Sequence, residues 1–192
     1  MKKRILTVAA IIVCLALLGA GTLAYFTDEA TAHNVITSNG IDIEIAEYHL
    51  SEKDELEPYP SEPIAVMPGV SVSKIVQVDN LDATAWIRAN VTIVVKDAEG
   101  VPMNLSADTL ASIIALDYNT EAWTAKDGWF YHNEPVAKGD STESLFETVK
   151  FSGPNMTNEY QNCTVEIIVD AQATQHANNG ATALEAAGWP AA

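Results

Sequence analysis

The twelve residues "TAWIRANVTIVV", positions 84–95, decide the fold class of this chain. Apolar side chains recur at every second position, and Arg88, Asn90 and Thr92 fill the positions between them. A period of two residues is typical of a β-strand with one face in a core and the other toward solvent. We therefore expect a half-buried strand at Trp86–Val95, with the inward side chains Ile87, Ala89, Val91, Ile93 and Val95.

Similar segments lie on both sides of this strand. "IDIEI" at 41–45 alternates isoleucine with an acidic residue, and further strands are expected at 70–78, 144–153 and 163–175. Asp127-Gly128 tolerates the positive φ of a tight turn and predicts a hairpin between two aromatic-rich strands. Short strands at regular intervals with little helix predict an all-β fold, an antiparallel β-sandwich.

One or two short helices are expected beside the strands. Ser106 is a suitable N-cap for a helix with Leu110, Ile113 and Ile114 on one stripe. The tail "NNGATALEAAGW", residues 178–189, is rich in alanine and predicts a second helix. Residues 49–68 combine prolines with many acidic residues, so we expect an extended, solvated loop there, with a binding arm as the alternative.

Residues 1–24 have the order of a secretory signal peptide. Three basic residues precede an apolar run, and the small residues Thr22 and Ala24 suit the −3 and −1 positions of a cleavage site. Cleavage there would make Tyr25 the first residue of a secreted chain comprising residues 25–192. The alternative is an uncleaved membrane anchor, because the apolar run is almost long enough to cross a bilayer.

The net charge limits the possible binding partners, and the cysteines indicate whether a disulfide is expected. The formal net charge of −16 becomes three units more negative if the leader is removed, so nucleic acid and anionic lipid surfaces are not expected partners. Membrane contact is expected only through the uncleaved leader. Cys14 lies in the apolar run, and Cys163 begins an alternating segment that predicts a buried apolar role and no disulfide.

Motifs for catalysis are not found. There is no HExxH or GxSxG sequence, and the histidines at 33, 49, 132 and 176 are far apart, which favours surface histidines over a zinc site assembled across the fold. "DAEG" and "KGDSTES" could offer oxygens to calcium, but both read better as turns. We therefore assign no catalytic, cofactor or metal residue. Trp123, Trp129, Phe130 and Tyr131 are expected to pack across strands, with sugar stacking as the alternative.

The segment 21–45, "GTLAYFTDEATAHNVITSNGIDIEI", resembles the exported TasA/camelysin family of bacterial biofilm-matrix proteins. It contains a G-T-x-A element, an aromatic pair, Thr27-Asp28, a Gly-containing turn and an alternating strand. The resemblance resumes at 84–95, 129–153 and 165–180. It implies processing by the dedicated signal peptidase of that system, a β-sandwich of jelly-roll type, and assembly into extracellular fibres.

Donation of a β-strand from one copy to the next is a physical mechanism by which such fibres could form. Cleavage would free residues 25–37 as an extended strand, which a neighbouring copy could pair with along an open sheet edge. We expect this donor strand to be anchored by Tyr25, Phe26, Val35 and Ile36 and to build a fibre of identical subunits. The alternative is that the segment is the domain's own first strand. Two other functions are kept: a secreted metallo-endopeptidase, as camelysin-type relatives are classed, and a cell-surface adhesin or binding module.

Overall fold

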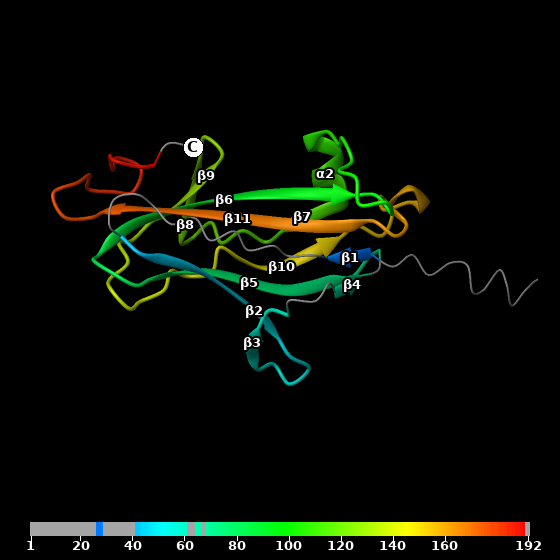
Figure 1. Cartoon of the computed structure of the whole chain (residues 1–192), viewed down its shortest axis with the longest axis horizontal. Coiled ribbons are helices and arrows are strands. Elements are labelled where there is room, and N and C mark those ends of the chain that lie inside the picture. The colour runs from blue at the N-terminus through cyan, green and yellow to red at the C-terminus, as the bar shows by residue number, and fades with distance from the viewer. Residues whose placement is uncertain (1–25, 29–40, 61–63, 67, 191–192) are drawn as a thin grey trace, which may run out of the picture.

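The fold is two β-sheets packed face to face (Figure 1). The computed structural model describes residues 26–28, 41–60, 64–66 and 68–190. In spatial order, sheet A contains β4 (Ile64–Val66), β1 (Phe26–Asp28), β11 (Thr164–Gln175), β6 (Ala85–Lys96), β9 (Trp129–His132) and β8 (Trp123–Lys126). Sheet B contains β3 (Leu56–Pro58), β2 (Ile43–Leu50), β5 (Ser71–Asn80), β10 (Phe146–Phe151) and β7 (Ile114–Leu116).

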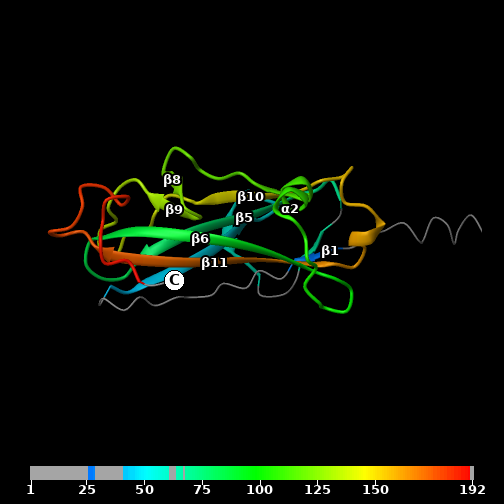
Figure 2. The same cartoon turned by 90° about the horizontal axis from the view of Figure 1, so that it is seen from above.

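Strands β6 and β11 form the frame of sheet A. They pair antiparallel over their whole length, from Thr164 opposite Lys96 to Gln175 opposite Ala85, and run side by side along the long axis (Figure 2). The alternation expected for residues 84–95 is present, since Ile87 and Ala89 are buried while Thr92 is exposed. The predicted all-β sandwich is confirmed.

The core lies between the two sheets. Inward residues of β6 and β11 meet inward residues of β2, β5 and β10, and almost all of them are aliphatic or aromatic. Burial of apolar surface on this scale is the main favourable contribution to folding. The fully buried members include Ile87, Ala89, Val165, Ile167 and Val169 from sheet A, and Val76, Val78, Phe146 and Val149 from sheet B.

One α-helix, α2 (Ala107–Ile113), lies among the described residues, together with a 3-10 turn at Asn158–Tyr160. Ser106 is the N-cap of α2, as the sequence predicts, and the Ser106 hydroxyl accepts a hydrogen bond from the Thr109 amide. Ile114 lies beyond the helix, at the start of β7. Neither helical segment of the described chain combines the length and apolar character needed to cross a bilayer.

The helix expected in the tail is wrong. Residues 178–189 form turns and irregular chain that cover the outer face of sheet A. The side chain of Asn179 accepts hydrogen bonds from the Gly180 and Ala187 amides and so closes this loop. A Cβ atom on Gly180 would lie 2.5 Å from the Glu185 carbonyl carbon. Tertiary contacts therefore override the helical preference of the alanines.

Residues 49–68, expected to be a loop, contain two short strands. β3 pairs with the end of β2, and β4 pairs with β1. All three residues of β3 are exposed, which agrees with a solvated segment. Strands of three residues show no useful alternation, Pro58 ends β3 and Pro63 precedes β4, so the sequence pattern favours a loop.

Candidate functional site

The segment predicted to be a donor strand enters sheet A at β1. Phe26–Asp28 lies between β4 and β11, antiparallel to the first and parallel to the second. Of the predicted anchors, Phe26 therefore belongs to a strand of its own chain, opposite Val66. The anchors Tyr25, Val35 and Ile36, and the cleavage residues Thr22 and Ala24, lie outside the described residues.

Strand β11 has two unequal edges. Toward β6, all twelve of its residues have a partner. Toward β1, the described residues pair only with Thr164 and Val165. Along residues 166–175, the described part of the chain therefore offers this edge no strand partner. Unpaired strand edges are ready templates for another extended segment.

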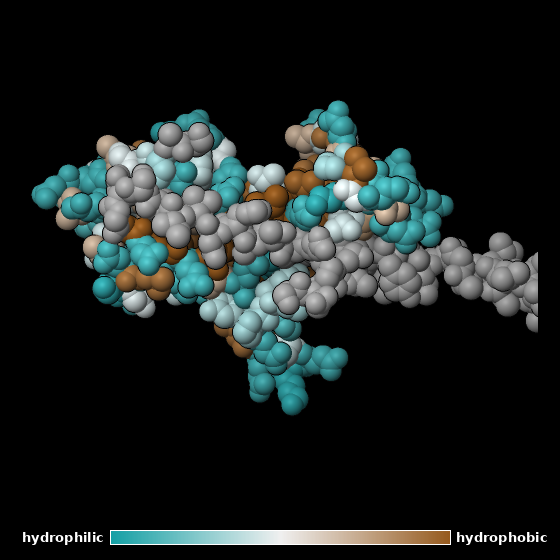
Figure 3. Space-filling view, in the orientation of Figure 1, coloured by the Kyte–Doolittle hydropathy of each residue, from teal (hydrophilic) through white to brown (hydrophobic). Residues whose placement is uncertain are grey.

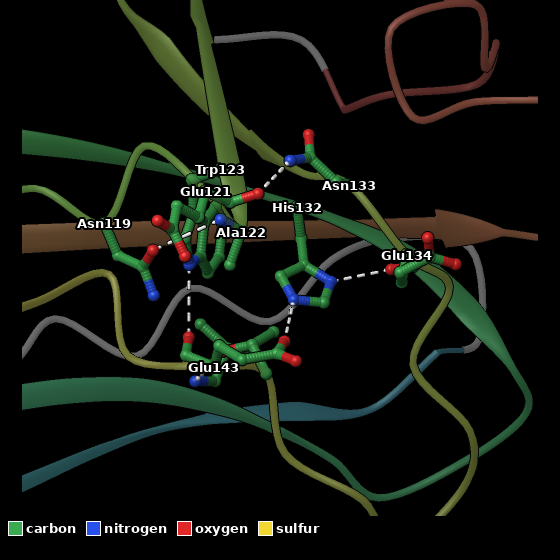
Figure 4. Close-up of polar contacts among 10 residues, drawn as sticks. Asn119, Glu121, Ala122, Trp123, His132, Asn133, Glu134 and Glu143 are labelled. Atoms are coloured by element: carbon green, nitrogen blue, oxygen red, sulfur yellow. Dashed lines mark hydrogen bonds and ion pairs between the residues drawn. The ribbon is translucent and has the colours of Figure 1, made fainter.

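A second candidate site surrounds His132 at the end of the β8–β9 hairpin (Figure 4). Asp127 and Gly128 have φ values of 51° and 82°, which confirms the predicted tight turn. The turn brings Trp123 opposite His132, and the two rings meet edge to face with centroids 5.0 Å apart. The imidazole is thus held inside the fold, with 3% of the residue exposed.

Both nitrogens of His132 have acceptor partners. Nδ1 lies 2.6 Å from the Glu134 carbonyl oxygen, and Nε2 lies 2.5 Å from Glu143 Oε2 (Figure 4). The hydrogen bond from His132 holds the pKa of the Glu143 carboxyl below its ordinary value of 4.5. The Trp123 indole N–H also donates to the Glu143 carbonyl oxygen, so the backbone and the side chain of this residue are both fixed.

Two surface pockets flank this histidine. One, of about 310 Å³, is lined by Asn119, Glu121, Ala122, His132, Asn133, Glu134 and Glu143. The other, of about 270 Å³, lies between the hairpin and the tail residues 182–184. The amide and carboxylate groups that line the first pocket can accept hydrogen-bonding ligands.

The histidines do not come together in the described chain. His132 is buried, so the prediction of a surface histidine is wrong there; the alternating strand "WFYH" carries the signal for burial. His49 lies 4.0 Å from Glu57, His176 packs edge to face on Trp86, and His33 lies outside the described residues. No group of three or more His, Cys, Asp or Glu side chains in the described chain is placed to share a metal ion. This donor set does not fit zinc, which takes at least three protein ligands in catalytic sites.

The two turns considered for calcium use their oxygens internally. Asp97 Oδ1 accepts hydrogen bonds from the amides of Glu99 and Val101 in "DAEG". In "KGDSTES", Ser141 donates to Asp79 and the Thr142 hydroxyl accepts from the Val78 amide. These contacts stabilise the turns.

The hairpin aromatics pack within the protein. Trp123 is buried, and Phe130 stacks on Tyr118 with a centroid separation of 4.3 Å. Trp129 lies on Arg88, whose guanidinium carbon is 4.2 Å from the ring centroid and 4.7 Å from that of Trp189. Cation–π contacts of this kind join β6, β9 and the tail. Cross-strand packing is therefore confirmed for these residues; the partner from the tail is the part that sequence reasoning missed.

Cys163 is buried, as predicted, with its sulfur 3.7 Å from the Met103 sulfur. Burial raises the pKa of its thiol, and the nearby carboxylates Asp97 and Glu99 raise it further. A thiol in these surroundings is a poor nucleophile, because the thiolate is the reactive form.

Comparison with known proteins finds one family match, to the N-terminal part of the chain. No curated protein and no solved structure matches the chain. Residues 1–61, which include β1, β2 and β3, match the family model described as camelysin metallo-endopeptidase. The N-terminal third of the chain is therefore similar to this family, in agreement with the resemblance that residues 21–45 carry.

Proposed function

We propose that this chain is a secreted structural protein that assembles into extracellular biofilm-matrix fibres by donating its N-terminal strand to a neighbouring copy. The observation that carries the proposal is the incomplete pairing of β11. Its twelve residues pair with β6 on one side, whereas on the other side, among the described residues, only Thr27 and Asp28 of β1 pair with it, at its beginning. The remaining edge is long enough for the rest of the donor segment.

The register of β1 supports a match between the length of the donor segment and the length of the β11 edge. Thr27 lies opposite Thr164 and Asp28 opposite Val165, in parallel. If a donor strand continued this register without a bulge, Val35 would lie opposite Gln172 and Ile36 opposite Ala173, close to the end of β11. Backbone hydrogen bonds along such a strand supply affinity, and the apolar side chains at alternate positions supply specificity.

Donation between copies explains a fibre. When a strand leaves one subunit and completes the next, the contact is heterologous, and the series does not close on itself. A leader that is cleaved after Ala24 by a dedicated signal peptidase would free Tyr25 and the following residues for this role, outside the cell. In the single chain, Phe26–Asp28 of this segment pair within their own sheet, and the two arrangements are compatible.

Deletion of residues 25–37 tests the proposal. The variant is expected to keep its β-rich circular dichroism spectrum and to form no fibres in negative-stain micrographs at concentrations at which the wild type does. A synthetic peptide of residues 25–37 serves as the matched control, because it should bind the deletion variant and should shorten wild-type fibres by occupying acceptor edges. Fibres of normal length from the folded deletion variant would contradict strand donation.

The second candidate is a secreted metallo-endopeptidase, which the description of the matching family favours. The donor set around His132 does not supply three metal ligands from the described residues, so we derive no catalytic step. Metal analysis of the purified protein together with a casein assay separates the two functions. Proteolysis that is abolished by a chelator and by His132→Gln would favour the peptidase.

A further inference from the structure

The end of β2 and β3 form a hairpin that leaves the sandwich. β2 pairs with β5 from Ile43 to Tyr48 and with β3 from Tyr48 to Leu50. Residues 48–58, which we name the acidic arm, project from sheet B (Figure 1). The arm belongs to the stretch for which the sequence left open a binding role.

The base of the arm is held by buried contacts. Lys74 on β5 is fully buried, and its Nζ lies 2.9 Å from Glu47 Oε1. The same ammonium lies 3.8 Å from the ring centroid of Tyr59, just beyond the arm. The Leu50 amide donates to the Ser73 hydroxyl at 3.0 Å. Desolvating a lysine has a large free-energy cost, and the close partners offset it only in one geometry. These contacts therefore fix the direction in which the arm points.

The tip of the arm is an ordered turn. The Ser51 amide donates to the Glu55 carbonyl, the Asp54 amide donates to the Ser51 carbonyl, and Asp54 takes a positive φ of 58°. The Ser51 hydroxyl accepts from the Glu55 amide. The side chains on the tip are thus presented by a defined backbone, which lowers the entropic cost of binding.

The exposed surface of the arm combines two leucines with acidic residues. Leu50 and Leu56 lie directly opposite each other in the hairpin and are 46% and 55% exposed. Around them lie the exposed carboxylates Glu52, Asp54, Glu55 and Glu57, against a single lysine, Lys53. Figure 3 shows the arm as a hydrophilic projection with a small hydrophobic area at its side. The two exposed leucines with a polar rim have the composition of a small contact surface.

The described part of this chain does not supply a surface of complementary charge. Its net charge is −16. In the described part, Lys74, Lys96 and Lys138 pair with carboxylates, and Arg88 lies between tryptophans. The exposed Lys126 and Lys150 lie on strands of different sheets. A second copy would therefore repel the arm more than attract it.

We propose that the acidic arm is a docking site for a basic segment of another protein, with an apolar side chain of that segment seated on Leu50 and Leu56. The carboxylates attract lysine and arginine and exclude acidic partners, as charged rims do at interfaces. The leucine pair contributes the desolvated centre of the contact. The proposal is independent of fibre formation, since the arm does not include the donor segment or β11.

Fluorescence anisotropy with two synthetic probes tests the arm in the purified full-length chain. One probe is a short lysine-rich peptide with two leucines, and the other carries serine in place of both leucines. The rim variant neutralises three carboxylates by Glu52→Gln, Glu55→Gln and Glu57→Gln. Its affinity for the leucine probe is expected to be about fivefold lower than that of the wild type, because exposed ion pairs contribute modestly. The matched control neutralises three exposed carboxylates elsewhere, by Glu99→Gln, Asp108→Asn and Glu185→Gln, and is expected to leave the affinity unchanged within about twofold.

The leucine pair has its own test. Leu50→Ser with Leu56→Ser is expected to abolish the preference for the leucine probe over the serine probe, while thermal unfolding stays close to wild type because both side chains are exposed. If the rim variant and the control variant lost the same affinity for the leucine probe, the proposal would be overturned, since binding would then follow net charge alone. Absence of a leucine preference in the wild type, or self-association that the arm variants abolish in sedimentation velocity, would overturn it as well.

Discussion

Glu143 lies on the surface, yet its side chain is bonded to a histidine inside the fold. Its side chain is 64% exposed, whereas that of His132 is 4% exposed. The contact fastens the loop before β10 to the β8–β9 hairpin, with the Trp123 indole as a second connection. At the scale of single residues, the chemistry of this region is that of a structural link between the β8–β9 hairpin and the loop that follows it.

This link predicts a pH dependence of stability. The hydrogen bond lowers the pKa of Glu143, so its contribution is present above the ordinary value of 4.5 and is lost as the pH falls through the lower folded-state pKa. Glu143→Gln should therefore reduce the free energy of unfolding near neutral pH, and the reduction should shrink as the pH falls through the folded-state pKa of Glu143. Urea denaturation across this range measures the difference.

Glu134→Gln is the matched control for that series, because Glu134 gives His132 only its backbone carbonyl. The difference in unfolding free energy between Glu134→Gln and the wild type should not vary with pH in the same range. A constant destabilisation of Glu143→Gln from neutral to acid pH would contradict the role given to the carboxylate.

Cys163 makes a second prediction at this scale. Burial raises the pKa of its thiol and blocks access to it, so a disulfide reagent should label the native chain at least about a hundredfold more slowly than the unfolded chain. The measurement uses a Cys14→Ala background, which leaves one thiol. Rapid labelling under native conditions would show that the 163 region opens.

At the scale of elements, the buried ion pair at the base of the acidic arm is a sharp test of the packing. Glu47→Gln leaves the Lys74 ammonium buried without its carboxylate, and the expected loss in unfolding free energy is about 3–5 kcal/mol. Glu47→Leu combined with Lys74→Met removes both charges and should recover most of that loss. Chemical denaturation of the single and double variants measures the coupling between Glu47 and Lys74. If both variants lost the same unfolding free energy, the role of the ion pair would be contradicted.

The tail offers another test at this scale. Gly180→Ala places a Cβ against the Glu185 carbonyl group and should detach the loop from Trp86, whose indole N–H donates to the Gly180 carbonyl oxygen. We expect a loss of about 1–3 kcal/mol in stability and a red shift of tryptophan emission. Ala181→Ser, at an exposed neighbouring position, is the control. An unshifted spectrum for Gly180→Ala would contradict the contact.

The elements differ in how far local sequence determines them. Long strands such as β6 and β11 were predictable because alternation over many residues outweighs other signals, and the Ser106 cap was predictable because capping is local. The tail was not, because Gly180 and Asn179 act through contacts with residues after them in the loop. β3 and β4 are too short to show a period.

The candidate site was less predictable than the fold for the same reason. His132 and Glu143 meet only because β9 and the loop before β10 pass each other in space, and no spacing in the sequence signals that contact. The acidic arm was visible as a composition, whereas its projection from sheet B depends on the pairing of β2 with two different strands.

At the scale of the whole molecule, the decisive question is whose N-terminal strand completes β11. If the donor strand continued the register of Thr27 with Thr164 and Asp28 with Val165 in parallel, His33 would lie opposite Asp170. Neighbouring strands lie about 4.8 Å apart, within the Cα range of a disulfide. His33→Cys and Asp170→Cys are therefore suitable reporters, in the Cys14→Ala background.

Mixing a chain that carries only His33→Cys with one that carries only Asp170→Cys distinguishes the two arrangements. Donation between copies predicts a covalent dimer of one chain of each kind after mild oxidation, and disulfide-linked ladders from the double variant under fibre-forming conditions. Glu99→Cys in place of Asp170→Cys is the control, since Glu99 is exposed in the turn after β6 and should not cross-link to position 33. A disulfide that forms only within single chains of the double variant would mean that each copy keeps its own strand, and strand donation would then not be the basis of assembly.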